Sequence, residues 1–195
     1  MSIALFSLLI AVLHDASHKI GLHPRLGVAC RSPHHMKGRV MVQDGDKAPD
    51  FELATDDGSK LRLSKLKGKP VVLYFYPKDD TSGCTAEAKD FTCLAADFRK
   101  AGVEIVGVSP DSVERHRKFR KKYDLDIRLA ADTDKAVAMA YGVWTEKSMW
   151  GRMFMGVERS TFLIDKSGHI AKSWRKVRVP GHAEAVLAAV RGLTK

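Results

Sequence analysis

The run PVVLYFY at residues 70–76 constrains the fold more than any other part of the sequence. It contains only proline, aliphatic and aromatic residues, and β-branched and aromatic side chains are typical of strands. At seven residues the run is too short for an ordinary helix, and it lacks the alternation of a strand with one solvated face. It therefore predicts a central strand that is buried on both faces, within a sheet that carries a covering layer on each side.

The segments around this strand are expected to alternate between strands and helices. Residues 51–63 predict two short strands around the turn DDGS, because Asp and Gly tolerate the positive φ of a tight turn. The same periodicities predict strands at 103–109, 127–132, 160–165 and 169–175, and helices at 84–102, 111–123, 135–143 and 182–193. This order predicts an α/β protein of thioredoxin-like fold, with a mixed central sheet, helices on both faces and an added N-terminal β-hairpin.

The first 40 residues differ in composition from the rest of the chain. They contain five of the eight histidines and an apolar run at 2–13, whose 12 residues are fewer than the ~20 that span a bilayer. A secretory signal would have a Lys or Arg before its apolar run, and none precedes this one. We therefore expect residues 1–40 to be a poorly structured extension and residues 41–195 to form the domain, with export of the protein as the alternative.

The basic balance of the chain bears on its partners and its compartment. The formal net charge is +10, and the densest basic run is RHRKFRKK at 115–122. Since no nucleic-acid-binding motif accompanies it, we expect a solvated helix face with Val113, Phe119 and Tyr123 turned inward, and neither nucleic acid nor a membrane as a partner. Three cysteines do not make a disulfide framework, which favours a reducing compartment such as the cytoplasm.

One of these cysteines, Cys84, lies where the buried strand gives way to a helix. Free backbone N–H groups and the helix dipole favour negative charge at such a position, and cysteines there are often reactive as thiolates. If Thr81 is the N-cap residue, Cys84 is the third residue of the helix, which places the hydroxyl of Thr81 beside it. Gly83 leaves room for an approaching group, and Pro77 fixes the path of the chain out of the strand.

Three other roles for Cys84 fit the sequence less well. A purely structural cysteine would prefer apolar neighbours, whereas this one follows KDDTSG. A zinc site needs further Cys or His ligands at suitable spacing, and none stands near it. A general thiol–disulfide oxidoreductase of the thioredoxin type needs a second cysteine after two intervening residues, and that position holds Glu87. A single activated cysteine is therefore the favoured interpretation, with no metal.

Several motifs, in order along the chain, carry a family resemblance. They are GDKAPDFEL, VVLYFYPKDDTSGCTAEA, GVSPDS, YGVWTEKSMWGRMFMGVERSTFLID and the final helix. Together they span residues 44–195, and over that range the sequence resembles the peroxiredoxins, specifically the bacterioferritin-comigratory-protein (PrxQ) branch. The resemblance implies a thioredoxin-like fold and a thiol-dependent peroxidase that reduces hydrogen peroxide and organic hydroperoxides, with no metal or organic cofactor. A non-enzymatic holdase chaperone is the alternative from another class.

The resemblance also implies roles for four residues. Cys84 would be the peroxidatic cysteine, which becomes a sulfenic acid. Thr81 would hydrogen-bond the peroxide and the thiolate, and Pro77 would shield the sulfur from water. Arg159, in ERSTFLID, would hold the thiolate and the charge on the leaving oxygen, although without the family it would be taken for a solvent-facing arginine at a strand edge.

The sequence departs from this branch at the resolving cysteine. Many members have a second cysteine five residues after the first, where this chain has Lys89. Cys93 lies nine residues on, about 13.5 Å along a helix and half a turn round it. The favoured interpretation of Cys93 is a small buried residue on the core face, with a resolving role as the alternative, and Cys30 is a further candidate.

We therefore expect a one-cysteine cycle, in which thioredoxin, glutaredoxin or a small thiol reduces the sulfenic acid. A monomer is expected, since members of this branch are often monomeric. The loop EKSMWGRMFMG at 146–156 is expected to shape the peroxide pocket.

Overall fold

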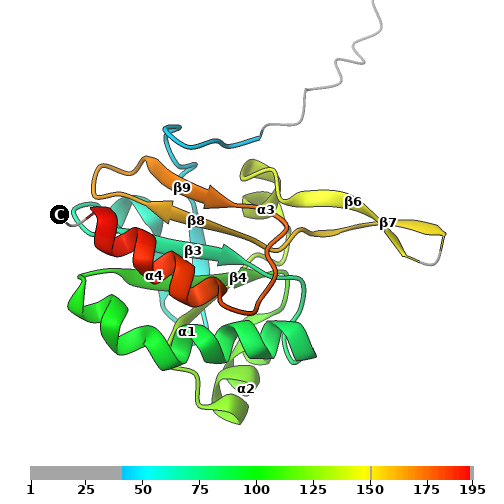
Figure 1. The fold of residues 1–195 in the computed structure, drawn as a ribbon. Coiled ribbons are helices and arrows are strands. Elements are labelled where there is room, and N and C mark those ends of the chain that lie inside the picture. The colour runs from blue at the N-terminus through cyan, green and yellow to red at the C-terminus, as the bar shows by residue number, and fades with distance from the viewer. Residues whose placement is uncertain (1–40, 150, 194–195) are drawn as a thin grey trace, which may run out of the picture. The chain divides into compact units, whose positions relative to one another are not determined.

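The computed structural model describes residues 41–149 and 151–193. The expected extension at 1–40 lies outside the described residues. A seven-stranded sheet forms the centre of the domain, in the order β2-β1-β5-β4-β3-β8-β9 (Figure 1). Its strands are β1 (Glu52–Thr55), β2 (Lys60–Arg62), β3 (Val71–Phe75), β4 (Glu104–Ser109), β5 (Arg128–Ala131), β8 (Ser160–Ile164) and β9 (Ile170–Trp174).

The strand predicted to be central is β3. It pairs in parallel with β4 on one side and antiparallel with β8 on the other, and β4 pairs in parallel with β5. Parallel neighbours need a crossover connection, which α1 (Ser82–Lys100) supplies between β3 and β4 and α2 (Val113–Tyr123) between β4 and β5. The antiparallel hairpin β1–β2 completes one edge. The sheet is therefore mixed, as predicted.

Alternation along β3 divides the core into two layers. Val71, Leu73 and Phe75 belong to one buried cluster, whereas Val72 and Tyr74 belong to the other. The helices α1, α2 and α4 (His182–Leu193) pack on the Val72 side, and α1 and α4 lie side by side there (Figure 1). The helix α3 (Ala136–Ala140) and the 3₁₀ helix η1 (Leu63–Leu66) pack on the Val71 side. Helices on both faces are thus confirmed.

A close approach between β3 and β4 seats helix α1. Tyr74 is paired with Gly107 in the ladder, and its ring lies across that glycine, where a Cβ would come within 2.5 Å of the hydroxyl oxygen. The ring of Tyr74 also stacks with that of Phe91 of α1, at a centroid distance of 4.8 Å. Gly107 is therefore needed because a side chain there would displace the ring on which α1 packs.

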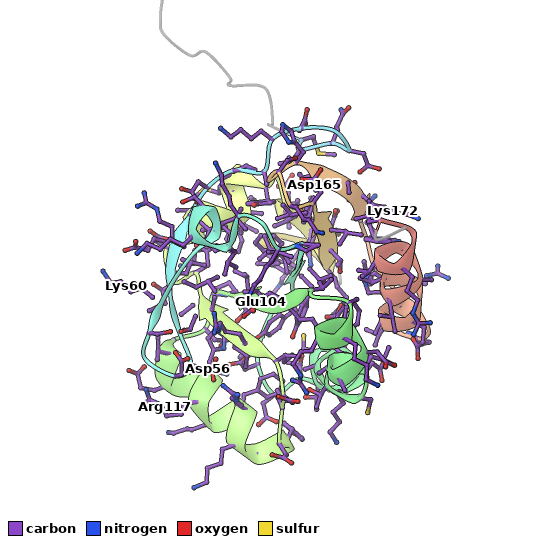
Figure 2. The ribbon with its side chains drawn as sticks, turned by 90° about the vertical axis from the view of Figure 1, so that its left-hand side faces the viewer. Asp56, Lys60, Glu104, Arg117, Asp165 and Lys172 are labelled. Atoms are coloured by element: carbon purple, nitrogen blue, oxygen red, sulfur yellow. The ribbon has the colours of Figure 1, made fainter. Side chains whose placement is uncertain are left out.

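The basic run of 115–122 lies on α2, and its basic residues are exposed as expected except Arg120, which is half-buried. Its Arg117 donates to the carbonyl of Asp56 at 3.2 Å, and the two residues lie close together in Figure 2. Phe119 is buried as expected, whereas Val113 and Tyr123 are only half-buried. The second residue of the run, His116, was not predicted to be buried, but none of its surface is exposed.

The segment predicted to be a loop at 146–156 forms a β-hairpin instead. Among the described residues, the strands β6 (Trp144–Met149) and β7 (Arg152–Val157) pair with each other and with no other strand, and they extend away from the main sheet (Figure 1). Gly151, at φ +74°, lies in the connection between them. The segment has few β-branched residues, and its strands are stabilised by cross-strand pairs rather than by a buried face, so local sequence preferences did not reveal them.

In the part of the chain that the structure describes, no helix is long and apolar enough to cross a membrane.

Candidate active site

The N-terminal turn of α1 carries Cys84. Thr81 is the N-cap residue, with extended backbone angles (φ −102°, ψ 151°), and Ser82 begins the helix. Cys84 is therefore the third helical residue, as the sequence predicts. The backbone N–H of Thr85 donates to the carbonyl of Thr81 at 2.8 Å, which closes the first turn. At this position the unpaired N–H groups of the helix end lie around the sulfur-bearing residue.

The side chain of Cys84 is buried, although the loop that precedes it is polar. Only 2% of the residue is exposed, and it belongs to the same buried cluster as Val72, Tyr74 and Ala88. The polar residues that precede Cys84 in the sequence do not form its surroundings, so the preference of structural cysteines for apolar neighbours does not distinguish the two roles here. The helix turn aims Cβ toward the core although its sequence neighbours are hydrophilic.

Arg159 reaches Cys84 from a segment 75 residues away. Its Nη2 donates to the sulfur at 3.2 Å. The ladder between β3 and β8 explains the meeting, because Phe75 is paired with Ser160, so that Arg159 stands where β3 gives way to the loop before α1. The Arg159 side chain is 16% exposed. The interpretation of Arg159 as a solvent-facing residue is therefore wrong, and the structure brings it to the sulfur.

Glu87 is a third member of this cluster, and the sequence analysis missed it. Its carboxylate accepts a hydrogen bond from Nη1 of Arg159, so one guanidinium contacts both Glu87 and Cys84. Burial raises the pKa of Glu87 to about 7, although the charge of Arg159 works in the opposite direction. Burial opposes the charge on Arg159 itself, but Glu87 and Cys84 raise its pKa overall. A signal existed in the sequence, because Glu87 stands one turn after Cys84 at a core position of an amphipathic helix.

Thr81 and Pro77 lie in the loop before α1, and both are exposed. Thr81 is the N-cap residue, but among the described residues its side chain makes no capping bond. Its hydroxyl donates to the carbonyl of Lys78 at 3.1 Å instead. Among the described residues, this hydroxyl therefore bonds to the loop and makes no hydrogen bond to Cys84. A Cβ on Gly83 would lie 3.4 Å from Nη2 of Arg159, so the glycine leaves room for the guanidinium.

The hairpin β6–β7 contributes Lys147 to the edge of the site. Its Nζ donates to the carbonyl of Val157 at 2.5 Å, two residues before Arg159. Burial lowers the pKa of Lys147, while Glu158 and Cys84 act to raise it and Arg159 to lower it. The segment expected to shape the pocket as a loop therefore borders the site as a strand, and it adds a second cation.

Cys93 lies outside this cluster. It is a free thiol on the exposed side of α1, so its interpretation as a buried core residue was wrong. Nine residues of helix place it half a turn from Cys84, and since Cys84 faces the core, Cys93 must face solvent. Lys89, where a second cysteine was sought, lies with its Nζ 5.1 Å from the ring centre of Tyr123. Cys30 is outside the described residues.

The cluster has the chemistry of a nucleophile and not of a metal centre. Among the described residues there is no group of three or more His, Cys, Asp or Glu side chains that could hold a metal ion. What the residues do provide is a shielded sulfur at a helix N-terminus, a planar cation in contact with it, and a carboxylate that holds the cation. This arrangement stabilises negative charge on sulfur and on an atom bonded to it.

Comparison with known proteins agrees with this chemistry. Residues 45–173 match the model of the AhpC/TSA family. The sequence is 47% identical over 156 residues to the peroxiredoxin Bcp of Bacillus subtilis, a match that covers 80% of this chain and 99% of the relative. It is 49% identical over 148 residues to a putative peroxiredoxin of Coxiella burnetii, a match that covers 76% of this chain and 98% of that relative.

A solved structure is similar as well. It is that of the Xanthomonas campestris bacterioferritin comigratory protein, a protein studied for its reduction of alkyl peroxides. The TM-score is 0.73 at 41% identity, and the match covers 80% of this chain and 99% of the other.

Proposed function

The chain belongs to the AhpC/TSA family as a peroxiredoxin, and we propose that Cys84 is the cysteine with which this thiol-dependent peroxidase attacks its substrate. The observation that carries the proposal is the 3.2 Å contact between Nη2 of Arg159 and the sulfur of Cys84, at the N-terminal turn of a helix. Both features favour a sulfur that reacts as the thiolate.

The reaction then follows from the atoms present. The Cys84 thiolate attacks the terminal oxygen of the hydroperoxide, the S–O bond forms as the O–O bond breaks, and the electron pair leaves on the second oxygen. A proton from solvent converts that oxygen to water or an alcohol, and Cys84 is left as a sulfenic acid. Arg159 stabilises the thiolate and the charge that develops on the leaving oxygen, and the paired Glu87 holds the guanidinium in that position.

Thr81 and Pro77 have supporting roles in this proposal. Because the hydroxyl of Thr81 donates its proton to the carbonyl of Lys78, its oxygen is left to accept one. It would therefore accept a hydrogen bond from the O–H of the peroxide. Pro77, which has no N–H to offer, would shield the sulfur of Cys84 from water.

We further propose that an external thiol completes the cycle. The external thiol attacks the sulfur of the sulfenic acid and releases water, and a second thiol then reduces the mixed disulfide and regenerates Cys84. Direct resolution by Cys93 would require α1 to unwind, because the two cysteines face opposite sides of the helix and a disulfide needs Cα atoms within about 7 Å. Thioredoxin, glutaredoxin or a small thiol would serve a monomeric, cytoplasmic enzyme whose catalytic domain is residues 41–195.

Measurement of peroxide consumption tests the role of Cys84. We expect Cys84→Ser to abolish thiol-dependent consumption of hydrogen peroxide and cumene hydroperoxide while leaving the circular dichroism spectrum unchanged. A holdase chaperone would keep its activity in that variant, and a general thiol–disulfide oxidoreductase would reduce a disulfide substrate faster than a peroxide. Retention of peroxidase turnover by Cys84→Ser would show that the assignment is wrong.

A further inference from the structure

Two consecutive aspartates precede Cys84, and the mechanism above uses neither. Asp79 is buried and Asp80 is exposed, although the two are adjacent in the loop between β3 and α1. A buried carboxylate is costly unless it is fully hydrogen-bonded. The contacts of Asp79 therefore indicate what the structure gains from its burial.

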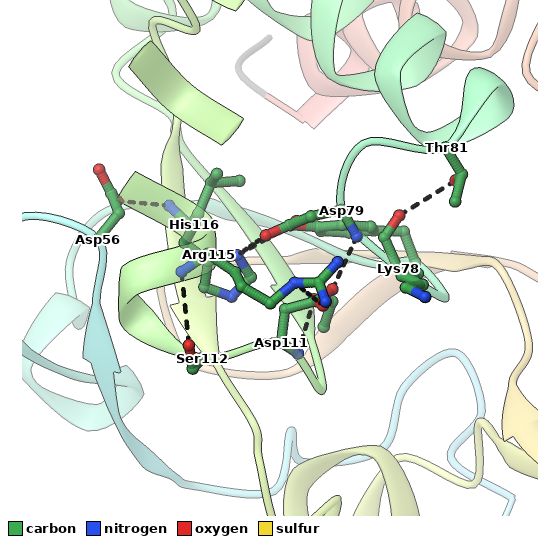
Figure 3. A network of polar contacts seen from close by, with 11 residues as sticks. Asp56, Lys78, Asp79, Thr81, Asp111, Ser112, Arg115 and His116 are labelled. Atoms are coloured by element: carbon green, nitrogen blue, oxygen red, sulfur yellow. Dashed lines mark hydrogen bonds and ion pairs between the residues drawn. The ribbon is translucent and has the colours of Figure 1, made fainter. Parts of the chain in front are cut away.

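Asp79 is bonded at three places. Its Oδ1 accepts from the hydroxyl of Tyr76 at 2.6 Å, its Oδ2 lies 2.8 Å from Nδ1 of His116, and its backbone N–H donates to Oδ2 of Asp111 at 2.7 Å. Burial raises the pKa of Tyr76 well above its ordinary value, so this hydroxyl remains a donor. Figure 3 shows Asp79, Asp111 and His116 converging between the loop and α2.

His116 is the histidine hidden in the basic run. None of its surface is exposed, and among the described residues its Nε2 has no hydrogen-bond partner. A buried imidazole with one unsatisfied nitrogen is unfavourable in itself. Since a carboxylate can only accept a hydrogen bond, Nδ1 of His116 is protonated and donates to Asp79. The ring is therefore placed at this position for its contact with Asp79.

The other end of the network is fixed to the sheet. Asp111 stands between β4 and α2, and its Oδ2 accepts from the hydroxyl of Ser109, the last residue of β4, at 2.9 Å. Its Oδ1 lies 2.9 Å from Nε of Arg115 (Figure 3). The loop before α1 is thus tied through Asp79 to β4 and to α2, two elements that follow α1 in the sequence.

The loop needs such fixation because of its backbone. Asp80 has φ +59°, a left-handed conformation that is uncommon for residues other than glycine. Conformations of this kind persist where the neighbouring contacts hold them. Thr81 follows immediately and is the N-cap residue of α1, so any movement of the loop would move the first helical turn.

We propose that Asp79 and His116 are positioning residues, which hold the loop before α1 and thereby place Cys84 for attack on the peroxide; this rests on the proposed role of Cys84. Neither residue touches the sulfur or Arg159 in the described contacts. They act through the backbone of the loop, which the three buried hydrogen bonds of Asp79 hold in place. The loop in turn keeps the N-terminal turn of α1 against Arg159.

Asp80 provides a matched control within the same loop. Its carboxylate is exposed and accepts from Nζ of Lys122 at 2.8 Å and from the hydroxyl of Tyr123 at 2.5 Å. Asp80→Asn removes the same negative charge one residue closer to Cys84, and asparagine tolerates the left-handed backbone. A comparison of Asp79→Asn with Asp80→Asn therefore separates the position of the loop from its charge.

The experiment uses the full chain with Cys30→Ser and Cys93→Ser, so that Cys84 is the remaining thiol. The variants are Asp79→Asn, His116→Gln, Asp80→Asn and Phe98→Leu, the last being a destabilising change at the far end of α1. Each is measured well below its melting temperature. The readouts are the rate constant of the reduced protein with hydrogen peroxide, by stopped flow, and the pH profile of alkylation of Cys84 by iodoacetamide.

We expect Asp79→Asn and His116→Gln to lower the peroxide rate constant about 10- to 100-fold and to move the alkylation profile to higher pH. Asp80→Asn and Phe98→Leu are expected to change the rate constant less than about threefold. If Asp79→Asn does not fold, Tyr76→Phe replaces it, because this change keeps the ring and removes one bond to Asp79. It is then expected to lower the rate constant about three- to tenfold.

The proposal is overturned if Asp79→Asn or its replacement lowers the melting temperature as Phe98→Leu does but leaves the rate constant and the alkylation profile at wild-type values. Alkylation does not depend on peroxide chemistry, so it reports the position of Cys84 even if the proposed function fails. Retained turnover in Cys84→Ser would identify that separate failure.

Discussion

Helix α1 carries two cysteines nine residues apart, and they have opposite environments. Cys84 stands in the first turn, buried, with Arg159 donating to its sulfur. Cys93 stands in the fourth turn and is exposed to solvent. Both are cysteines of one helix, so the difference between them cannot come from residue type or local secondary structure. It comes from the position along the helix and from the elements that the helix packs against.

The physical difference lies in what surrounds each sulfur. The field of the helix N-terminus falls off within the first turn, so it acts on Cys84 and not on Cys93. Arg159 and Glu87 add a fixed cation and the carboxylate that orients it, on the core side of the helix. The contrast teaches that the surroundings proposed to activate Cys84 come from its position in the fold, and that Cys93, on the same helix, lacks them.

Removal of the Arg159 guanidinium should reduce the difference between Cys84 and Cys93 more than any other change. We expect Arg159→Ala to lower the rate constant with hydrogen peroxide about 10²- to 10³-fold, because loss of one preorganised donor at a developing charge has effects of this size. Arg159→Lys should restore only part of the lost rate constant, since an ammonium group cannot contact Glu87 and Cys84 as the planar guanidinium does. Stopped-flow measurement checks this, with the exposed Arg99→Ala as control. An Arg159→Ala rate constant near wild type would refute the role of the contact.

Glu87 should give the stability of the protein a specific pH dependence. Its pKa is raised from 4.5 to about 7 in the folded protein. A raised carboxyl pKa contributes stability below pH 4.5 that is lost as the pH rises through 7, by at most about 3 kcal/mol. Wild type should therefore lose more unfolding free energy than Glu87→Gln between pH 4.5 and 7.5, as measured with urea. The exposed Glu114→Gln serves as control, and parallel curves for wild type and Glu87→Gln would contradict the prediction.

Thr81 should affect the reaction of Cys84 with peroxide more than its reaction with other reagents. We expect Thr81→Val to lower the peroxide rate constant about tenfold, the value of one lost hydrogen bond in the transition state, and Thr81→Ser to stay near wild type. The reaction of Cys84 with iodoacetamide, which does not need the peroxide hydrogen bond, should change much less. Equal effects of Thr81→Val on both reactions would mean that Thr81 acts on the helix start and not on the substrate.

The smallest effect is expected at the other cysteine. Cys93→Ser should change steady-state turnover with an external thiol less than about twofold, because Cys93 faces solvent on the side of α1 opposite to Cys84. The measurement is peroxide consumption over many cycles with thioredoxin and with dithiothreitol. A variant that stops after one equivalent of peroxide would show that Cys93 is the resolving cysteine and that α1 unwinds.

Much of this site could be predicted from the sequence because its determinants are local. The apolar run at 70–76 specified the central strand, and a cap at Thr81 placed Cys84 in the third helical position. Family resemblance singled out Arg159, although nothing in its own neighbourhood in the sequence distinguished it. Glu87 was missed although it occupies a core position of α1, because carboxylates are usually assigned to the exposed face of a helix.

Other features depended on contacts between distant segments, and local patterns contain no information on these. The sequence by itself determined the order of strands and helices and the place of Cys84 at a helix start, since periodicity and capping act over a few residues. Only the tertiary structure decided that Arg159 meets the sulfur, that Asp79 is bonded to His116, and that Cys93 is exposed. The reason is that the register of β3 with β8 and the packing of α2 bring together residues that are 37 to 75 positions apart in the chain.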